Sequence, residues 1–225
     1  MLNKVRPALG RVLTPIGKAV ARTGITPNAV TIIGTVGVVA GAIGWFPHQE
    51  YFWGTMVITA FVLFDMLDGA VARVTGKISK FGAFLDSTMD RIADAAIFSG
   101  LMIGLYREGD RDTLAALALY CMVAGVVTSY AKARAESLGY TCNVGIAERA
   151  ERTILVLVAT GLDGLGVPYV LAAGLVVLAV LSTITVGQRL GTVYKQAQAE
   201  QKPKTESQGS QESPRTEESS AESRT

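Results

Sequence analysis

Long apolar stretches, repeated along the chain, constrain this sequence more than any other feature. A membrane-spanning helix needs about 20 predominantly apolar residues, because the hydrocarbon core of a bilayer is about 30 Å thick. Each stretch approaches that length once the polar residues at its ends are included, and the mean hydropathy of +0.34 is high for a soluble protein. The pattern predicts six transmembrane helices, centred on residues 31–46, 51–64, 84–106, 113–130, 153–162 and 169–186.

Basic residues alternate between the turns that would join these helices. Of the 21 Lys and Arg residues, 18 fall in the N-terminal segment, in the turns after the second and fourth helices, and after the sixth helix. The opposite turns hold only Arg107 and Arg111. Cytoplasmic loops of membrane proteins carry the excess of Lys and Arg. We therefore expect a multi-pass protein of the cell membrane, with both termini and the turn after the second helix in the cytoplasm.

The two ends of the chain differ from the predicted membrane domain, residues 26–195. Residues 1–25 space apolar side chains at helical intervals among Lys and Arg, which predicts an amphipathic helix at the membrane surface. Thr26 and Pro27 are typical of an N-cap and a first helical turn, so the first transmembrane helix should begin there. Residues 196–225 contain no aromatic residue and little to bury, which predicts a disordered cytoplasmic tail.

The cysteines and the net charge argue against two classes of protein. Cys121 lies in a predicted membrane helix and Cys142 in a cytoplasmic turn, so no disulfide framework is expected. The formal net charge of +2 is too small to indicate nucleic-acid binding. Membrane lipids are the expected partners of the basic residues, because the cytoplasmic leaflet is anionic.

Four aspartates stand at the cytoplasmic ends of the second and third predicted helices. Asp65 and Asp68 are three residues apart, and Asp86 and Asp90 are four apart, so each pair should share a helical face. The short turn of residues 75–82 makes the two helices antiparallel neighbours. All four carboxylates should therefore converge at one depth, just below the cytoplasmic surface.

Carboxylates gathered in this way indicate a divalent metal site. One unpaired charge within a bilayer costs at least ~2.5 kcal/mol, so four together need cations to neutralise them. Oxygen ligands suit Mg²⁺ or Mn²⁺, and the one histidine, His48, lies on the opposite side of the membrane. A single aspartate near a helix end is often a helix cap or part of a surface ion pair, but neither role explains four aspartates at this spacing. We expect two metal ions and phosphoryl-transfer chemistry.

The spacing of these residues resembles the signature of a known enzyme family. Residues 65–90 read Asp-x2-Asp-Gly-x2-Ala-Arg-x8-Gly-x3-Asp-x3-Asp, which matches the CDP-alcohol phosphotransferases at all eight fixed positions. Members of this family transfer a substituted phosphate from a CDP-linked donor to an alcohol and release CMP. The resemblance implies an all-α integral membrane fold, a homodimer and a Mg²⁺-dependent enzyme.

The resemblance also assigns roles to individual residues. The metals would be held by Asp65, Asp68, Asp86 and Asp90. Asp90 would also act as general base on the acceptor hydroxyl. The residues against the CDP donor would be Gly69, Ala72 and Arg73. CDP-diacylglycerol suits a site at this depth, because its diphosphate lies among the lipid headgroups and its acyl chains lie in the bilayer.

The turn after the fourth predicted helix indicates which alcohol accepts the phosphatidyl group. Its sequences SYAKARAE and ERAER are similar to the actinobacterial phosphatidylinositol phosphate synthases, which use myo-inositol 1-phosphate. The implied pocket for the acceptor phosphate consists of Ser129, Lys132, Arg152 and Arg189. Arginine binds phosphate with two parallel hydrogen bonds, although each basic side chain taken alone would equally anchor the protein to anionic lipids. Phosphatidylglycerophosphate synthases, which use glycerol 3-phosphate, are the nearest alternative.

Two other classes of membrane protein gather carboxylates. Intramembrane prenyltransferases hold Mg²⁺-diphosphate with aspartate-rich motifs, but those motifs lie far apart in sequence, whereas one short turn joins them here. A cation transporter places its carboxylates near the middle of the membrane on broken helices. The aspartates here cluster at one face, so we expect a phosphatidyltransferase that uses CDP-diacylglycerol. CMP release from that donor would separate the three classes.

Overall fold

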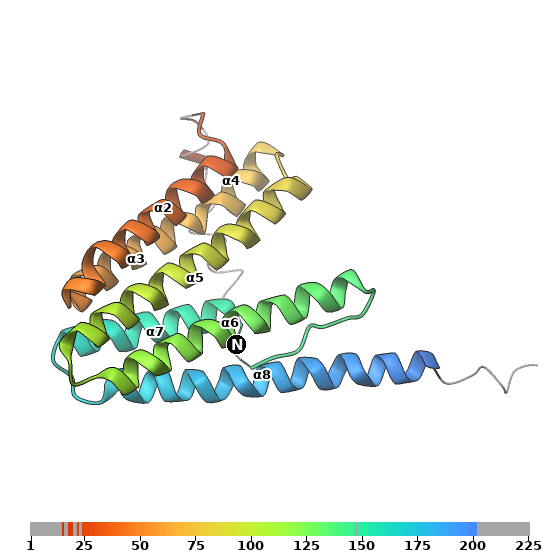
Figure 1. Ribbon diagram of the computed structural model, residues 1–225. Coiled ribbons are helices and arrows are strands. Elements are labelled where there is room, and N and C mark those ends of the chain that lie inside the picture. The colour runs from red at the N-terminus through yellow and green to blue at the C-terminus, as the bar shows by residue number, and fades with distance from the viewer. Residues whose placement is uncertain (1–14, 16–17, 20–21, 23, 147, 202–225) are drawn as a thin grey trace, which may run out of the picture.

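In the part of the chain that the structure describes, helices are joined by turns and loops, and no strand is present (Figure 1). The computed structural model describes residues 15, 18–19, 22, 24–146 and 148–201. The amphipathic helix expected for residues 1–25 falls almost wholly outside these residues, as does the expected tail beyond Gln201.

Eight helical segments follow one another along the described residues. Helices α3 and α4 form one interrupted pass, because the α-helix stops at Met66 and resumes at the next residue. The segments are α2 (Pro27–Trp45), η2 (Phe46–His48), α3 (Tyr51–Asp65), α4 (Leu67–Thr75), α5 (Lys80–Glu108), α6 (Asp112–Ser137), α7 (Arg149–Gly164) and α8 (Val170–Gln201).

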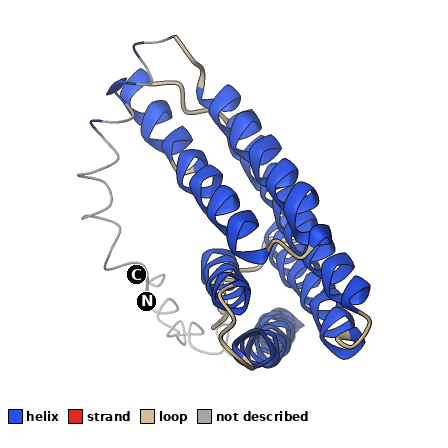
Figure 2. Ribbon diagram, turned by 90° about the vertical axis from the view of Figure 1, so that its left-hand side faces the viewer, coloured by secondary structure: helices blue, strands red, loops and turns tan. Residues whose placement is uncertain are grey.

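The six long helices close into a ring. Helix α2 packs against α3 and α5, α6 packs against α5 and α8, and α7 packs against α3 and α8. Figure 1 shows the ring as two layers, with α2, α3 and α5 in one and α6, α7 and α8 in the other. Figure 2, turned by 90°, shows that the helices of the two layers are inclined to one another. The inside of the ring is therefore lined by side chains from elements far apart in sequence.

The helices have the length and surface of a membrane protein. Among the described residues, four passes are long and apolar enough to span a bilayer: Pro27–His48, Tyr51–Thr75, Asp112–Ser137 and Val170–Glu200. Large apolar side chains such as Val36, Trp53 and Leu63 are exposed on the outside of the bundle, where lipid would cover them. Helix α5 has 29 residues but carries several charges in its first half, and α7 has only 16 residues.

Small residues bring α5 against α2 and so fix the helix that carries two of the aspartates. A Cβ atom added at Gly100 or Gly104 would collide with the backbone carbonyl oxygens of Ala42 and Phe46, respectively. Glycine at these positions allows the two backbones to touch, as it does between membrane helices in general. The register between α2 and α5 is thereby set near their C-terminal ends.

Side-chain contacts hold the start of the first long helix and the end of the last one. Thr26 caps α2 as predicted, since its Oγ1 accepts a hydrogen bond from the Ala29 amide at 3.3 Å. Helix α8 continues through Gln201, beyond the boundary expected at residue 195. The loop after α6 packs along this extension, and the Gln196 side chain donates to the Thr141 carbonyl oxygen at 2.7 Å. Composition alone did not reveal that contact.

A polar network holds the end of the bundle that lies opposite the aspartates. Arg111, just before α6, donates two hydrogen bonds to Asp163 of α7, at 2.8 and 2.9 Å. The same guanidinium lies 3.2 Å from Glu108 of α5, and Glu108 accepts a hydrogen bond from Tyr51 of α3. Elements from both layers are thus tied together at this end.

Candidate active site

The four aspartates lie at the end of the bundle where α3 stops and α5 starts. Asp65 is the last residue of α3, and Asp86 and Asp90 lie one turn apart in α5. Carboxylate oxygens of these three residues all lie within 4.8 Å of one another. We call Asp65, Asp86 and Asp90 the aspartate cluster. Two helices thus bring three carboxylates close enough to share a ligand.

The surroundings of Asp65 suit a bound cation. Its Oδ1 atom is buried and has no hydrogen-bond partner among the described residues. Gly34 of α2 lies directly against it, since a Cβ atom added at Gly34 would be 2.9 Å from the Asp65 Cβ. A buried carboxylate oxygen without a partner is costly, and a metal ion would satisfy it. The aspartate cluster therefore fits a divalent metal.

Asp68 is held differently. It lies in the first turn of α4, and Oδ2 accepts a hydrogen bond from the buried Thr31 hydroxyl of α2 at 2.8 Å. Its other oxygen accepts from the backbone amide of Gly69. Because the helix is interrupted at Met66, Asp65 ends α3 and Asp68 lies in the first turn of α4. Sequence spacing did not indicate that break or the contact with Thr31.

A basic side chain from α7 reaches the aspartate cluster. Arg149 Nη1 lies 2.6 Å from Asp90 Oδ1, and Arg149 Nε lies 3.5 Å from Asp94 Oδ1. Asp94 also pairs with Arg152, whose Nη2 is 3.3 Å from Oδ2, and accepts from the Thr153 hydroxyl at 3.4 Å. The site therefore continues from the aspartates into a network of α5 and α7.

The sequence interpretation did not include Arg149 or Asp94 among the site residues. Asp94 follows Asp90 by four residues, so both lie on one face of α5. Arg149, Arg152 and Thr153 similarly share one face of α7. These spacings were visible in the sequence, but nothing in the sequence shows that the two faces oppose each other.

The three residues expected at the CDP donor lie together in α4. Gly69 and Ala72 are partly buried and Arg73 is exposed. A Cβ atom added at Gly69 would be 3.5 Å from Arg73 Nη1. The missing side chain at Gly69 thus leaves room for this guanidinium one turn beyond Asp68.

Three of the four expected acceptor residues gather around one stretch of α6. The guanidinium of Arg152 is buried against Gly125, where an added Cβ atom would lie 3.4 Å from Cζ. Ser129 donates to the Gly125 carbonyl oxygen at 3.0 Å. Arg189 of α8 donates to the carbonyl oxygen of Thr128, the neighbour of Ser129. An arginine of α7 and an arginine of α8 thus contact the stretch of α6 that carries Ser129.

Lys132, the fourth of these residues, lies one turn further along α6. Its Nζ atom is 3.8 Å from Glu136 Oε1 on the same helix, and the pair is partly exposed. An exposed pair at this spacing contributes little to stability, so the lysine is free to change partners.

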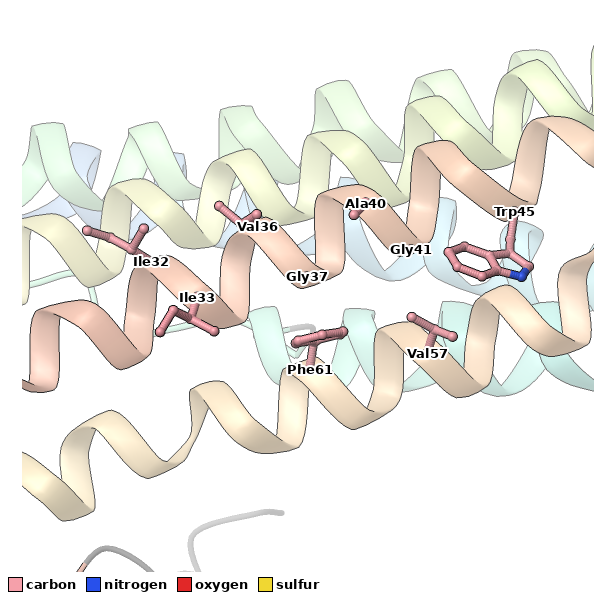
Figure 3. Close-up of a pocket in the computed structure, with 9 residues that line it drawn as sticks. All are labelled: Ile32, Ile33, Val36, Gly37, Ala40, Gly41, Trp45, Val57 and Phe61. Atoms are coloured by element: carbon pink, nitrogen blue, oxygen red, sulfur yellow. The ribbon is translucent and has the colours of Figure 1, made fainter. Parts of the chain in front are cut away.

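An apolar groove lies beside the aspartate cluster, between α2 and α3, with a volume of about 470 Å³. Figure 3 shows its lining side chains along both helices. Ile33 stands next to Gly34, the residue that contacts Asp65, and Trp45 lies at the far end of α2. The groove is lined by Ile32, Ile33, Val36, Gly37, Ala40, Gly41, Trp45, Val57 and Phe61.

Most of the chain matches a known family and its members. The family model described as CDP-alcohol phosphatidyltransferase matches residues 24–185. A phosphatidylinositol phosphate synthase of Streptomyces avermitilis is 46% identical over 205 residues, which cover 88% of this chain and 84% of that protein. One of Mycobacterium marinum is 48% identical over 193 residues, which cover 84% of this chain and 82% of that protein.

Solved structures share the fold. The crystal structure of a Mycobacterium tuberculosis phosphatidylinositol phosphate synthase with manganese and citrate has a TM-score of 0.78 at 45% identity, and covers 81% of this chain and 88% of that chain. The structure of that synthase with CDP-diacylglycerol has a TM-score of 0.77 at 46% identity, with coverages of 82% and 94%.

Proposed function

Since this chain belongs to the CDP-alcohol phosphatidyltransferase family, we propose that it transfers the phosphatidyl group of CDP-diacylglycerol to myo-inositol 1-phosphate. The products are phosphatidylinositol phosphate and CMP. The observation that carries this proposal is the aspartate cluster beside a long apolar groove. A lipid donor needs its diphosphate held by metal and an apolar surface for its acyl chains, and both are present at one place.

The reaction forms one bond and breaks one bond at phosphorus. A hydroxyl oxygen of the acceptor bonds to the phosphorus of the phosphatidyl group, and the bond from that phosphorus to the bridging oxygen breaks. CMP leaves with the bridging oxygen, and Asp90 accepts the hydroxyl proton as general base. Arg149 holds the Asp90 carboxylate in place through the 2.6 Å ion pair.

Two Mg²⁺ ions, replaceable by Mn²⁺, belong to the proposed site. Asp65, Asp68, Asp86 and Asp90 hold them, which accounts for the unpartnered Oδ1 of Asp65. When bound, the ions supply positive charge that neutralises the donor diphosphate and the leaving CMP. Gly69, Ala72 and Arg73 of α4 lie against the cytidine and its phosphates.

We place the protein in the cell membrane as a homodimer with six transmembrane helices, both termini and the aspartates facing the cytoplasm. The distribution of 18 of the 21 basic residues supports this orientation. We further propose residues 1–25 as the surface helix, residues 26–195 as the membrane domain and residues 196–225 as a cytoplasmic tail, of which residues 196–201 extend α8. The homodimer follows from the family resemblance.

The proposed function is tested with a panel of acceptors. Purified protein in detergent is given CDP-diacylglycerol with inositol 1-phosphate, glycerol 3-phosphate, inositol or serine, and CMP and lipid products are measured. We expect phosphatidylinositol phosphate from inositol 1-phosphate and no lipid product from the unphosphorylated acceptors. Turnover with glycerol 3-phosphate alone would replace the proposal by a phosphatidylglycerophosphate synthase. No CMP release with any acceptor would refute the reaction class.

Replacing Arg152 with glutamine tests the acceptor pocket that we propose for Ser129, Lys132, Arg152 and Arg189. A charge-assisted contact to phosphate is worth ~1.5–3 kcal/mol, so the KM for inositol 1-phosphate should rise about tenfold to a hundredfold. The KM for CDP-diacylglycerol should stay unchanged, because metal and Arg73 hold its phosphates. Steady-state kinetics with each substrate varied in turn provide the measurement.

The matched control for this substitution is Arg134→Gln. It removes an exposed arginine from the last turn of α6, the helix that carries Ser129 and Lys132. If Arg152 only anchors the protein to anionic lipids, both variants should lower membrane stability and leave the acceptor KM unchanged. Arg152→Lys keeps the charge but loses the paired hydrogen bonds, so its KM should lie between those of the wild type and Arg152→Gln.

A further inference from the structure

Asp94 is a buried carboxylate that the proposed reaction does not use. It lies within α5, one turn beyond Asp90, and is 9% exposed. Burying a carboxylate is costly unless it is paired and hydrogen-bonded. The partners of Asp94 all come from one face of α7, and they are Arg149, Arg152 and Thr153.

The geometry joins two parts of the proposed site through this one side chain. Arg149 bridges two carboxylates, with Nη1 at 2.6 Å from Asp90 and Nε at 3.5 Å from Asp94. Arg152 contacts the other oxygen of Asp94 at 3.3 Å. One oxygen of Asp94 thus faces the arginine that touches the general base, and the other faces the arginine of the acceptor pocket.

The network crosses the inside of the helix ring. Helix α5 packs mainly against α2 and α6, whereas α7 packs mainly against α3 and α8. Gly125 of α6 leaves the space in which the Arg152 guanidinium lies beside Asp94. Both arginines therefore depend on polar contacts from a neighbouring layer for their position.

We infer that Asp94 is a positioning residue, which holds Arg149 against the general base and Arg152 in the acceptor pocket, so that both keep a fixed spacing. This inference depends on the proposed function, because the spacing matters only if the acceptor carries both a reacting hydroxyl and a phosphate. The phosphate binds at Arg152, and the hydroxyl must then reach Asp90. Small errors in such an alignment reduce turnover strongly.

Asp94→Asn is the central test, since it keeps the size of the side chain and removes its charge. The KM for inositol 1-phosphate should rise about tenfold, and kcat should fall by a similar factor, because both arginines lose a charged partner. The Kd for CDP-diacylglycerol should remain that of the wild type. Unchanged acceptor KM and kcat in a folded Asp94→Asn enzyme would overturn the inference.

Asp163→Asn is the matched control. Asp163 also pairs with an arginine, Arg111, at 2.8 Å, and its side chain is 10% exposed against 12% for Asp94. It lies at the opposite end of the bundle, so its loss should lower the melting temperature and leave both kinetic constants unchanged. If it altered them as Asp94→Asn does, the role of Asp94 would be structural and the inference would be wrong.

A double-mutant cycle shows whether Asp94 acts through Arg152. In the double variant Asp94→Asn/Arg152→Gln, the fold increase in the acceptor KM should be well below the product of the fold increases in the two single variants. The reason is that the second substitution removes a contact that the first has already misplaced. Independent, multiplying effects would contradict the inference. If Asp94→Asn does not fold, Thr153→Val removes a hydroxyl that donates to Asp94 and should raise the acceptor KM in the same direction by a smaller factor.

An error in the proposed function and an error in the role of Asp94 would give different experimental results. The wild-type protein would then release no CMP with inositol 1-phosphate, whatever the Asp94 variants do. A wild type that uses inositol 1-phosphate, together with an Asp94→Asn variant that matches it, would leave the function intact and refute the positioning role alone.

Discussion

Replacing Asp86 or Asp65 with asparagine should reduce turnover to background. Each substitution removes one negative charge from the aspartate cluster, in which three carboxylates lie within 4.8 Å of one another. Mn²⁺ binding, followed by electron paramagnetic resonance or calorimetry of the purified protein, should fall from two ions in the wild type to fewer in either variant. This readout does not depend on catalysis, so it separates loss of metal from loss of chemistry.

The control for this prediction is Asp110→Asn, which removes an exposed carboxylate at the opposite end of α5. It should bind metal and turn over as the wild type does. Chelation with EDTA should abolish wild-type activity, and added Mg²⁺ should restore it. Full activity in excess EDTA, or Mn²⁺ binding that is unchanged in Asp65→Asn, would contradict a metal site built on these carboxylates.

Replacing Asp90 with asparagine should lower kcat by a factor of about 10²–10⁴, the usual contribution of a general base. Asparagine keeps the size of the side chain and loses the proton acceptor. CDP-diacylglycerol should still bind, which a direct binding measurement on the purified variant checks. Loss of donor binding that fully accounts for the lost turnover would make Asp90 a metal ligand and not a base.

Arg149→Gln tests whether the effect of Asp90 comes from proton transfer or from its ion pair with Arg149. It breaks the 2.6 Å ion pair but leaves the carboxylate in the site. If Asp90 is the base, Arg149→Gln should lower kcat much less than Asp90→Asn does. Equal losses in the two variants would mean that the ion pair, and not proton transfer, accounts for the effect of Asp90.

The sequence predicted the convergence of the aspartates because the information is local. Two helices joined by a short turn must place their adjoining ends side by side, and three of the four carboxylates do meet. The exception, Asp68, depends on the interruption at Met66 and on Thr31 of α2. Neither can be derived from spacing, because both follow from the way α2 packs across α3 and α4.

The contacts of α7 could not be predicted for a similar reason. Arg149 and Arg152 follow Asp94 by more than fifty residues, and their contact with it depends on the order of helices around the ring. The apolar stretches indicate where helices lie along the chain but not that order. Residues expected to bind phosphate thus proved to have protein partners that composition and spacing do not reveal.

The charges of α5 also bear on how the chain enters a membrane during synthesis. The insertion machinery accepts segments by their apolarity, and one charge at a helix centre costs about 2.5–3.5 kcal/mol on that scale. Helix α5 carries Asp86, Asp90, Arg91 and Asp94, whereas its partners Arg149 and Arg152 emerge later, on α7. Within α5, Arg91 pairs with Asp90 at 3.7 Å, but the ion pairs of Asp94 among the described residues are made only with α7. We therefore expect α5 and α7 to enter the bilayer as a pair, with Asp94 held by Arg149 and Arg152.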